Sequence, residues 1–275
     1  MIKDIMVHLD GSLEDEIRLE HGQAIASIGR AHLVGVFTNL LPELTMAMPM
    51  DGGAAMIQAL SEFEDRAREE GDAHAERLMK RLSGLQTPSE FRRLDATFAG
   101  LSASVAAQAR CADLFIATRP DGRSEIADWT DLVEAVIFGS GRAVLLVPPG
   151  RRPQGPIQTV LIAWNGSRES ARALREGLDL ISQATRTIVL IVDPSPDAAA
   201  SVKAHLAHHG VVAEIATVQS GDRRIADVIL EEARRVSADI VVMGAYGHSR
   251  LREQIFGGAT RDMLAASDRP ILLAH

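Results

Sequence analysis

An internal repeat constrains the fold of this chain more than any other feature of its sequence. Residues 2–12 read IKDIMVHLDGS and residues 157–167 read IQTVLIAWNGS, so each copy has a short apolar segment that ends in an Asx-Gly-Ser turn. A helical pattern and a second apolar segment follow in both copies, at 13–28 and 32–37 in the first and at 168–181 and 187–192 in the second. We therefore expect two copies of one fold.

The two copies also end alike. ADLFIA at 112–117 matches ADIVVM at 238–243, and RAVLLV at 142–147 matches RPILLA at 269–274. The matches therefore run from the start of each copy to its end.

A proline, glycine and arginine segment separates the copies. Residues 148–156 read PPGRRPQGP, a composition typical of a connection between domains. We expect one domain over residues 1–148, a linker over 149–156 and a second domain over 157–275.

Short apolar segments alternate with helical patterns within each copy. Strands that are apolar on both faces are typical of a parallel sheet covered by helices on each side. The predicted fold class is α/β, with two tandem doubly wound parallel-sheet domains of Rossmann-like type. Ligands of such sheets bind at the carboxyl ends of the strands, which here are the turns after Leu9, Ala163, Val192 and Met243.

Further elements are expected in both copies. In the second copy we expect helices at 198–209, 224–237 and 261–266 and strands at 211–217 and 271–273; in the first copy, extra length at 41–60 and a charged, solvated helix at 61–82.

Composition argues against several classes of partner. The formal net charge is −8 and aromatic residues are 4%, which disfavours nucleic acid and anionic membrane surfaces. No apolar run approaches the roughly 20 residues that cross a bilayer, and the charged start MIKDIMVHLDGS is unlike a signal peptide. We expect a cytoplasmic protein without membrane or nucleic-acid partners.

Residues 244–260, GAYGHSRLREQIFGGAT, combine glycines with basic residues. Gly244 follows an apolar strand, and a glycine pair precedes the last helix, whose first amides would attract an anion. The charged and hydroxyl side chains at hand are Arg250, Arg252 and Thr260. The segment predicts a phosphate site, with helix capping as the simpler alternative. It fits neither the P-loop nor the dinucleotide-binding pattern.

The second half resembles a universal stress protein domain. The resemblance is carried by WNGS (164–167), by the stretch 220–250 that ends in VVMGAYGHSR, and by FGGAT (256–260). Nucleotide-binding members of that family carry G-x2-G-x9-G-[ST], which Gly244, Gly247 and Gly257 fit. Gly258 departs from the pattern, since serine or threonine is usual there; Thr260 offers a hydroxyl two residues later.

The resemblance implies an adenine nucleotide alpha hydrolase-like fold with ATP, AMP or ADP, with or without Mg²⁺, across the strand ends. Most members have aspartate in the first turn where this half has Asn165, whose amide can still bond a ribose hydroxyl. The implied binding residues are Ala163, Trp164, Asn165, Val192, Met243, Gly244, Gly247, His248, Arg250, Gly257, Gly258, Ala259 and Thr260.

The first half lacks the phosphate end of this pattern. It keeps the first turn at Asp10-Gly11-Ser12, but Ala117-Thr118-Arg119-Pro120 replaces the glycine pair. Pro120 has no amide donor, and Thr118 adds a side chain where Gly244 has none. We expect this domain to be degenerate, with the only competent site in the second half and the first half serving as a partner surface.

The resemblance implies a role in stress response as a nucleotide-dependent regulatory or interaction protein with unidentified protein partners. A slow ATP hydrolase and an interaction module with a vestigial site are the alternatives. We assign no catalytic residue and no metal site. Single-domain relatives usually pair, so the two halves are expected to pair internally as a pseudo-dimer, and homodimerisation stays open.

Three further features have simple explanations. The histidines of HLAHHG (205–210) read as a polar helix end capped by Gly210 rather than a zinc site. The methionines between 46 and 56 favour an adaptable contact surface or lid over copper binding. The single cysteine, Cys111, excludes an intrachain disulfide and is expected to be a small packed residue.

Overall fold

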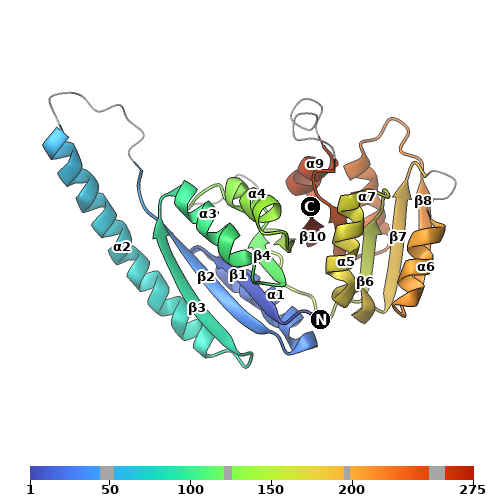
Figure 1. Ribbon diagram of the computed structural model, residues 1–275, viewed down its shortest axis with the longest axis horizontal. Coiled ribbons are helices and arrows are strands. Elements are labelled where there is room, and N and C mark those ends of the chain that lie inside the picture. The colour runs from blue at the N-terminus through green and yellow to red at the C-terminus, as the bar shows by residue number, and fades with distance from the viewer. Residues whose placement is uncertain (44–52, 121–125, 195–198, 248–257) are drawn as a thin grey trace.

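The computed structural model describes residues 1–43, 53–120, 126–194, 199–247 and 258–275, with the side chains of 53–57 outside this description. Figure 1 shows two α/β halves side by side, with the N-terminus close to the junction between them. None of the described helices combines the length and the apolar character needed to cross a membrane.

The two halves have the same order of elements. The first half consists of β1 (Asp4–Leu9), α1 (Glu14–Gly29), β2 (His32–Leu40), α2 (Gly53–Ser83), β3 (Ser89–Ala96), α3 (Phe98–Ala109), β4 (Leu114–Thr118), α4 (Thr130–Gly139) and β5 (Ala143–Val147). The second half consists of β6 (Thr159–Ala163), α5 (Arg168–Gln183), β7 (Arg186–Val192), α6 (Ala200–His208), β8 (Ala213–Val218), α7 (Ile225–Arg235), β9 (Ile240–Gly244), α9 (Ala259–Ala266) and β10 (Ile271–Ala274).

All of these strands form one continuous sheet. Its order is β3-β2-β1-β4-β5-β10-β9-β6-β7-β8, so each half contributes five strands in the same relative order. Strands within a half are parallel, and the equivalent strands β5 and β10 pair antiparallel, with Ile271 opposite Leu146. The expected doubly wound parallel sheets are confirmed, and an antiparallel seam that the sequence does not predict joins them.

Helices cover both faces of the sheet because the strands are apolar on both sides. One buried cluster includes Leu19 of α1, Leu78 of α2 and Leu174 of α5. The other includes Leu101 of α3 and Ile229 of α7. The sheet is therefore the middle layer of three, which leaves its strand ends as the places where loops meet.

Helix α5 illustrates how the sequence specifies these elements. Ser167 is its N-cap, and the Ser167 hydroxyl oxygen accepts a 3.1 Å hydrogen bond from the amide of Ser170. Its buried residues recur at helical spacing, namely Ala173, Leu174, Leu178 and Ile181. The cap and the apolar stripe together fix where the helix begins and which face it packs.

The expected helix at 61–82 is the larger part of α2, which begins earlier, at Gly53. Ala75, Leu78 and Leu82 are buried against the sheet, and most of the charged residues of α2 from residue 58 on are exposed or half-buried, as expected for a solvated face. The methionines between 46 and 50, and the side chain of Met56, lie outside the described residues.

The expectation for Cys111 is wrong, because this residue is exposed. It lies in the turn after α3, where the buried positions are its neighbours Ala109 and Ala112. The histidine-rich helix end is confirmed: α6 ends at His208, and Gly210 follows with φ +76°. In the described part of the chain, no group of three histidine, cysteine or carboxylate side chains is placed to hold a metal ion.

Candidate functional site

The sheet register brings the three expected strand ends of the second half together, while Leu9 ends a strand of the first half, across the antiparallel seam. Ala163 at the end of β6 pairs with Met243 of β9, and Val192 ends the neighbouring strand β7. The amide of Trp164 donates a 2.9 Å hydrogen bond to the carbonyl of Leu190, which fixes the chain as it leaves β6. These residues therefore share one edge of the second half, as parallel strands require.

The turn after β6 is an Asx turn, in which the side-chain oxygen of Asn165 already accepts a hydrogen bond from the backbone. The Asn165 side-chain oxygen accepts a 3.0 Å hydrogen bond from the amide of Ser167, and Gly166 between them has φ +73°. Asn165 itself is exposed. Its amide nitrogen therefore remains to donate to a ligand, whereas its oxygen shapes the turn.

Gly244 allows the first turn of α5 to approach β9. An added Cβ would lie 2.6 Å from both the carbonyl carbon of Glu169 and the amide nitrogen of Ser170. Both are backbone atoms, so no side-chain movement could make room. Gly244 therefore makes room for the backbone of α5, and its close contact is with protein atoms.

Glu169 places a negative charge beside the glycine loop. Its carboxylate is buried and pairs with Arg168 at 2.9 Å. A Cβ on Gly247 would lie 3.2 Å from Glu169 Oε2. Burial raises the pKa of Glu169, but hydrogen bonds from its own backbone amide, Arg168 and Ser167 outweigh that effect and leave the pKa below its usual value. A carboxylate therefore borders the place where the sequence predicts a phosphate.

Tyr246 joins the glycine loop to two other elements. Its amide donates a 3.0 Å hydrogen bond to Thr260 Oγ1 in the first turn of α9. Its phenol donates to Glu134 Oε1 of α4 at 2.9 Å, and its ring lies 4.9 Å from that of Phe138. With φ +55°, Tyr246 is in the left-handed region that few residues other than glycine adopt. Thr260, 3% exposed, holds the loop against the helix.

The amino end of α9 supplies backbone donors. Gly258 is the N-cap, with φ −96° and ψ 150° and no capping side chain. Within the described residues, no acceptor binds the amides of Ala259 and Arg261. An anion would find these donors together with the positive end of the helix dipole. His248, Arg250 and Gly257 lie outside the described residues.

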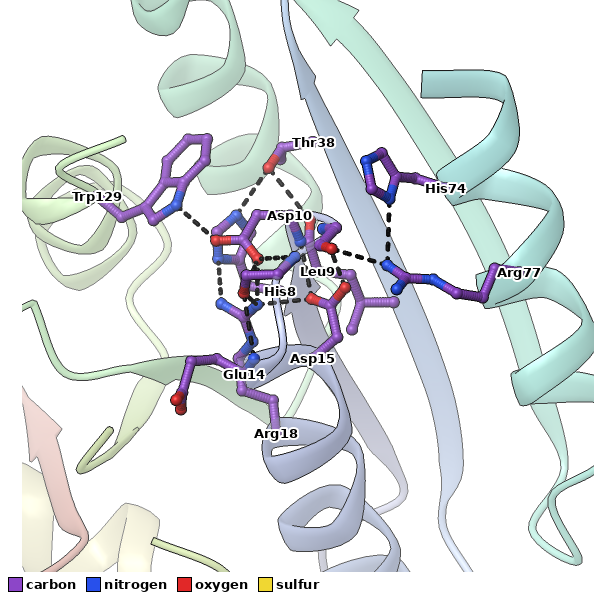
Figure 2. A network of polar contacts seen from close by, with 12 residues as sticks. His8, Leu9, Asp10, Glu14, Asp15, Arg18, Thr38, His74, Arg77 and Trp129 are labelled. Atoms are coloured by element: carbon purple, nitrogen blue, oxygen red, sulfur yellow. Dashed lines mark hydrogen bonds and ion pairs between the residues drawn. The ribbon is translucent and has the colours of Figure 1, made fainter. Parts of the chain in front are cut away.

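The corresponding edge of the first half is closed by its own side chains (Figure 2). Asp10 is 6% exposed. Asp10 Oδ1 accepts from the hydroxyl of Ser12 at 2.6 Å and from Arg18 at 2.5 Å, and Asp10 Oδ2 accepts from the Trp129 indole at 2.8 Å. Both oxygens that would meet a ribose are therefore already paired.

Arg18 is the centre of this buried cluster. Its guanidinium, 1% exposed, contacts the carboxylates of Asp10 and Asp15 and lies 3.3 Å from His8 Nδ1. The two oxygens of Asp15 accept the amides of Asp10 and Gly11 at 2.9 Å each. The carboxylate of Asp15 thus occupies the backbone donors of the turn after β1.

Burial and charge set the pKa values in this cluster. Burial, followed by the positive charge of Arg18, lowers the pKa of His8 to about 3. Burial raises the pKa of Asp15 to about 6, and the charge of Asp10 adds to that rise. The pKa of Asp10 is lowered by Arg18 against the effect of burial. His8 is therefore neutral, and the fixed positive charge is that of Arg18.

The loops of the two halves cross the seam in both directions. Arg119, from the segment that replaces the glycine pair, donates from its guanidinium to the carbonyls of Leu264 and Ala265, the latter at 3.1 Å. It therefore meets the carbonyl end of α9, where a cation is favourable. Tyr246 makes the reciprocal contact with α4.

Sequence reasoning missed Glu169, Tyr246 and Trp129. Tyr246 is the single tyrosine and Trp129 one of two tryptophans in a chain with 4% aromatic residues. That rarity was a usable signal, because buried tyrosine and tryptophan need partners for their polar atoms. No local pattern marks Glu169, whose place depends on how α5 packs against β9.

Together, the fold and this edge define a class of protein: a doubly wound α/β protein with a glycine loop and a helix start at the carboxyl ends of its strands. Comparisons with known proteins agree. The sequence profile of the universal stress protein family matches residues 156–275. The match covers 120 of the 275 residues, so the second half of the chain is similar to a universal stress protein domain.

Individual relatives are more distant. The stress response protein NhaX of Bacillus subtilis (strain 168) is 42% identical over 48 residues, 18% of this chain and 29% of that protein. The chain thus spans less than a third of this curated relative.

Two solved structures match nearly the whole chain. A universal stress protein from Archaeoglobus fulgidus DSM 4304 is similar with a TM-score of 0.66 and 15% identity, covering 98% of this chain and 95% of that one. A putative universal stress protein from Pseudomonas aeruginosa UCBPP-PA14 is similar with a TM-score of 0.59 and 17% identity, and the match covers 99% of this chain and 93% of that one. At these identities the likeness concerns the fold, which extends over both halves.

Proposed function

We propose that the second half of this chain binds one adenine nucleotide at the carboxyl ends of β6, β7 and β9, and that the first half binds none. Adenine and ribose would lie over Ala163, Trp164 and Val192, and the phosphates at the start of α9. Nucleotide occupancy would then regulate contacts with protein partners as part of a stress response.

The observation that carries this proposal is the start of α9. The amides of Ala259 and Arg261 have no acceptor in the described part of the chain, and Thr260 fastens the glycine loop beside them. Backbone donors that are fixed before binding cost little to organise around an anion. In the first half, the backbone donors of the turn after β1, the amides of Asp10 and Gly11, are occupied by Asp15.

A regulatory role requires two conformations with different nucleotide affinity. Tyr246 offers a physical link, since it contacts both Thr260 of α9 and Glu134 of α4. A ligand that moves the glycine loop would therefore also disturb α4 in the other half. The partner surface is expected on the first half for this reason.

Ala259→Pro tests the proposal at a single donor. Residue 259 is the first residue of α9, where proline is tolerated, and the extended backbone of Gly258 suits a following proline. The substitution removes one amide donor without breaking the helix. Calorimetric titration with ATP should show one site per chain, weakened about tenfold or more by the lost charge-assisted bond.

Ala259→Gly is the matched control, because it changes the same side chain and keeps the amide. It should bind ATP within a few-fold of the unmodified protein. Equal ATP affinity in the proline and glycine variants would contradict the proposal, as would two equivalent sites per chain. Phosphate release measured in the same samples separates binding from slow hydrolysis.

An interaction module with a vestigial site is the second candidate. Two observations favour it: the carboxylate of Glu169 borders Gly247, and the Thr260 hydroxyl already accepts from Tyr246. The negative charge of Glu169 beside the glycine loop would repel a phosphate group. Glu169→Gln distinguishes the two candidates: it should tighten ATP binding if the site is functional, and should leave binding undetectable if the site is vestigial.

A further inference from the structure

A cavity of about 510 Å3 lies at the junction of the two halves. It is enclosed by the later part of α1, the linker and the residues at the start of β6 and β9. Its apolar walls include Ala24, Ile25, Ile28, Leu145, Ile157 and Ile240. The volume falls within the roughly 300–1,000 Å3 of small-molecule sites, and such walls suit an apolar ligand body.

This cavity is separate from the proposed nucleotide site. Ile240 is the first residue of β9, and Ile157 precedes β6. The proposed nucleotide site lies at the other ends of these strands, at Ala163 and Met243. Each site can therefore be altered without touching the other.

One positive charge at this cavity has no counter-ion. Arg151 is a half-buried residue, and no described residue forms a hydrogen bond or an ion pair with its guanidinium. The backbone of Arg151 is held, because its amide donates to Pro148 at 3.2 Å and its carbonyl lies 2.9 Å from His21 Nε2. The neighbouring Arg152, by contrast, pairs with Glu20.

The other charged residues on the wall, Arg152 and Asp239, form no ion pair with Arg151. Asp239 Oδ2 accepts the amides of Gln158 and Thr159 at 2.8 Å each, so this carboxylate already serves the backbone. Burial lowers the pKa of His21, which favours its neutral form. Arg151 is therefore the charge that a ligand would meet.

We propose that this cavity binds a small amphiphilic carboxylate, with its apolar body among the isoleucines and its carboxylate on Arg151. A guanidinium donates two parallel hydrogen bonds to a carboxylate. A single guanidinium balances one negative charge, which favours a carboxylate over a phosphate dianion. A bound ligand would touch α1 of the first half, the linker and the start of β9, and so bridge the two halves.

Decanoate, a ten-carbon carboxylate, is the probe, used with the full chain and below its micelle-forming concentration. Calorimetric titration should give one saturable site per chain. Decan-1-ol and decyltrimethylammonium, with the same chain and a neutral or positive head, should bind more weakly. Arg151→Gln should weaken decanoate about tenfold or more and leave decan-1-ol unchanged. Arg152→Gln is the matched control: this arginine also lines the cavity, but it is paired with Glu20, so its loss should weaken decanoate far less than Arg151→Gln.

Ala24→Phe tests the cavity itself by filling it from α1, and should abolish binding of both decanoate and decan-1-ol. Circular dichroism verifies that this variant is folded, and Ile157→Phe fills the cavity from the linker side if it is not. Absence of saturable decanoate binding would overturn the proposal, as would equal affinity in Arg151→Gln. A third result would also overturn the proposal: the unmodified protein self-associates, Ala24→Phe removes that self-association, and decanoate does not bind. The surface would then be a contact with a second copy of the chain.

Discussion

The phenol of Tyr246 donates a 2.9 Å hydrogen bond to the carboxylate of Glu134, and thereby ties the glycine loop after β9 to helix α4 of the other half. In the opposite direction, Arg119 reaches from the loop after β4 to the last carbonyls of α9. Equivalent loops of a repeated fold thus contact each other's final helix across the β5–β10 seam. The seam is held by side chains as well as by strand pairing.

Tyr246→Phe removes this hydrogen bond while keeping the ring that packs on Phe138. Because the acceptor is a carboxylate that is only partly buried, we expect a loss of about 1–2 kcal/mol in the free energy of unfolding. Urea unfolding measures this value. Glu134→Gln keeps an acceptor oxygen and should lose less. Unchanged stability in Tyr246→Phe would show that the contact does not hold the halves together.

Gly244→Ala tests whether this glycine is required by packing. The added Cβ would lie 2.6 Å from two backbone atoms of α5, so helix and strand must separate. Overpacking of this kind costs about 1–3 kcal/mol. Gly84→Ala is the control, since its nearest atoms would be 3.6 Å away, and it should stay within about 0.5 kcal/mol of the unmodified protein. Equal effects in thermal or urea unfolding would refute this explanation.

Trp129→Phe tests the closure of the first half. The variant keeps an aromatic ring beside His8, at 4.8 Å, and Phe98, at 5.5 Å, but removes the indole donor to Asp10. A buried carboxylate oxygen then lacks a partner, which should cost about 2 kcal/mol. The control Trp164→Phe, at a partly buried position, should cost less, because within the described residues its indole makes no hydrogen bond. Similar losses in both variants would contradict the assigned role of Trp129.

His8 gives a pH dependence with a definite sign. Its pKa is about 3 in the folded protein and 6.5 in the unfolded chain, so between these values the unfolded state binds more protons. The stability that neutral His8 provides is therefore present above pH 6.5 and lost as the pH falls toward 3. Asp15, whose pKa is raised from 3.8 to about 6, acts in the opposite direction over a narrower range.

His8→Asn isolates this effect, because the other titrating groups are common to both proteins. The stability difference between the original protein and the variant should shrink, or reverse, as the pH is lowered from 7 to 4. Urea unfolding at several pH values measures it. A difference that stays constant over this range would mean that His8 is not buried in its neutral form.

Much of the fold could be predicted from the repeat. Two copies of strand, Asx-Gly-Ser turn and helix indicate two parallel α/β units, and the expected strand ends of the second half meet at one edge because parallel pairing requires it. The antiparallel pairing of β5 with β10 could not be predicted. This pairing depends on how the sheets of the two halves pack against each other. The apolar sequence of strand 143–147 is compatible with a buried position beside a parallel or an antiparallel neighbour.

The candidate site was predictable in outline. The glycines and the helix start were visible in the sequence, but their partners come from distant elements. Gly244 faces α5, and the Thr260 hydroxyl accepts a hydrogen bond from the amide of Tyr246. The closure of the first half depends equally on Trp129, 119 residues away from Asp10. Such pairings follow from tertiary packing, which local patterns do not encode.

The most direct test of the central claim follows the backbone amides themselves during an ATP titration, by nuclear magnetic resonance of the nitrogen-15-labelled protein. The amide signals of Ala259, Thr260 and Arg261 should shift saturably, with one nucleotide bound per chain, while those of Asp10 and Gly11 stay in place. Binding of ATP that leaves the signals of residues 259–261 unmoved, or that shifts residues 10 and 11 equally, would contradict the proposed site.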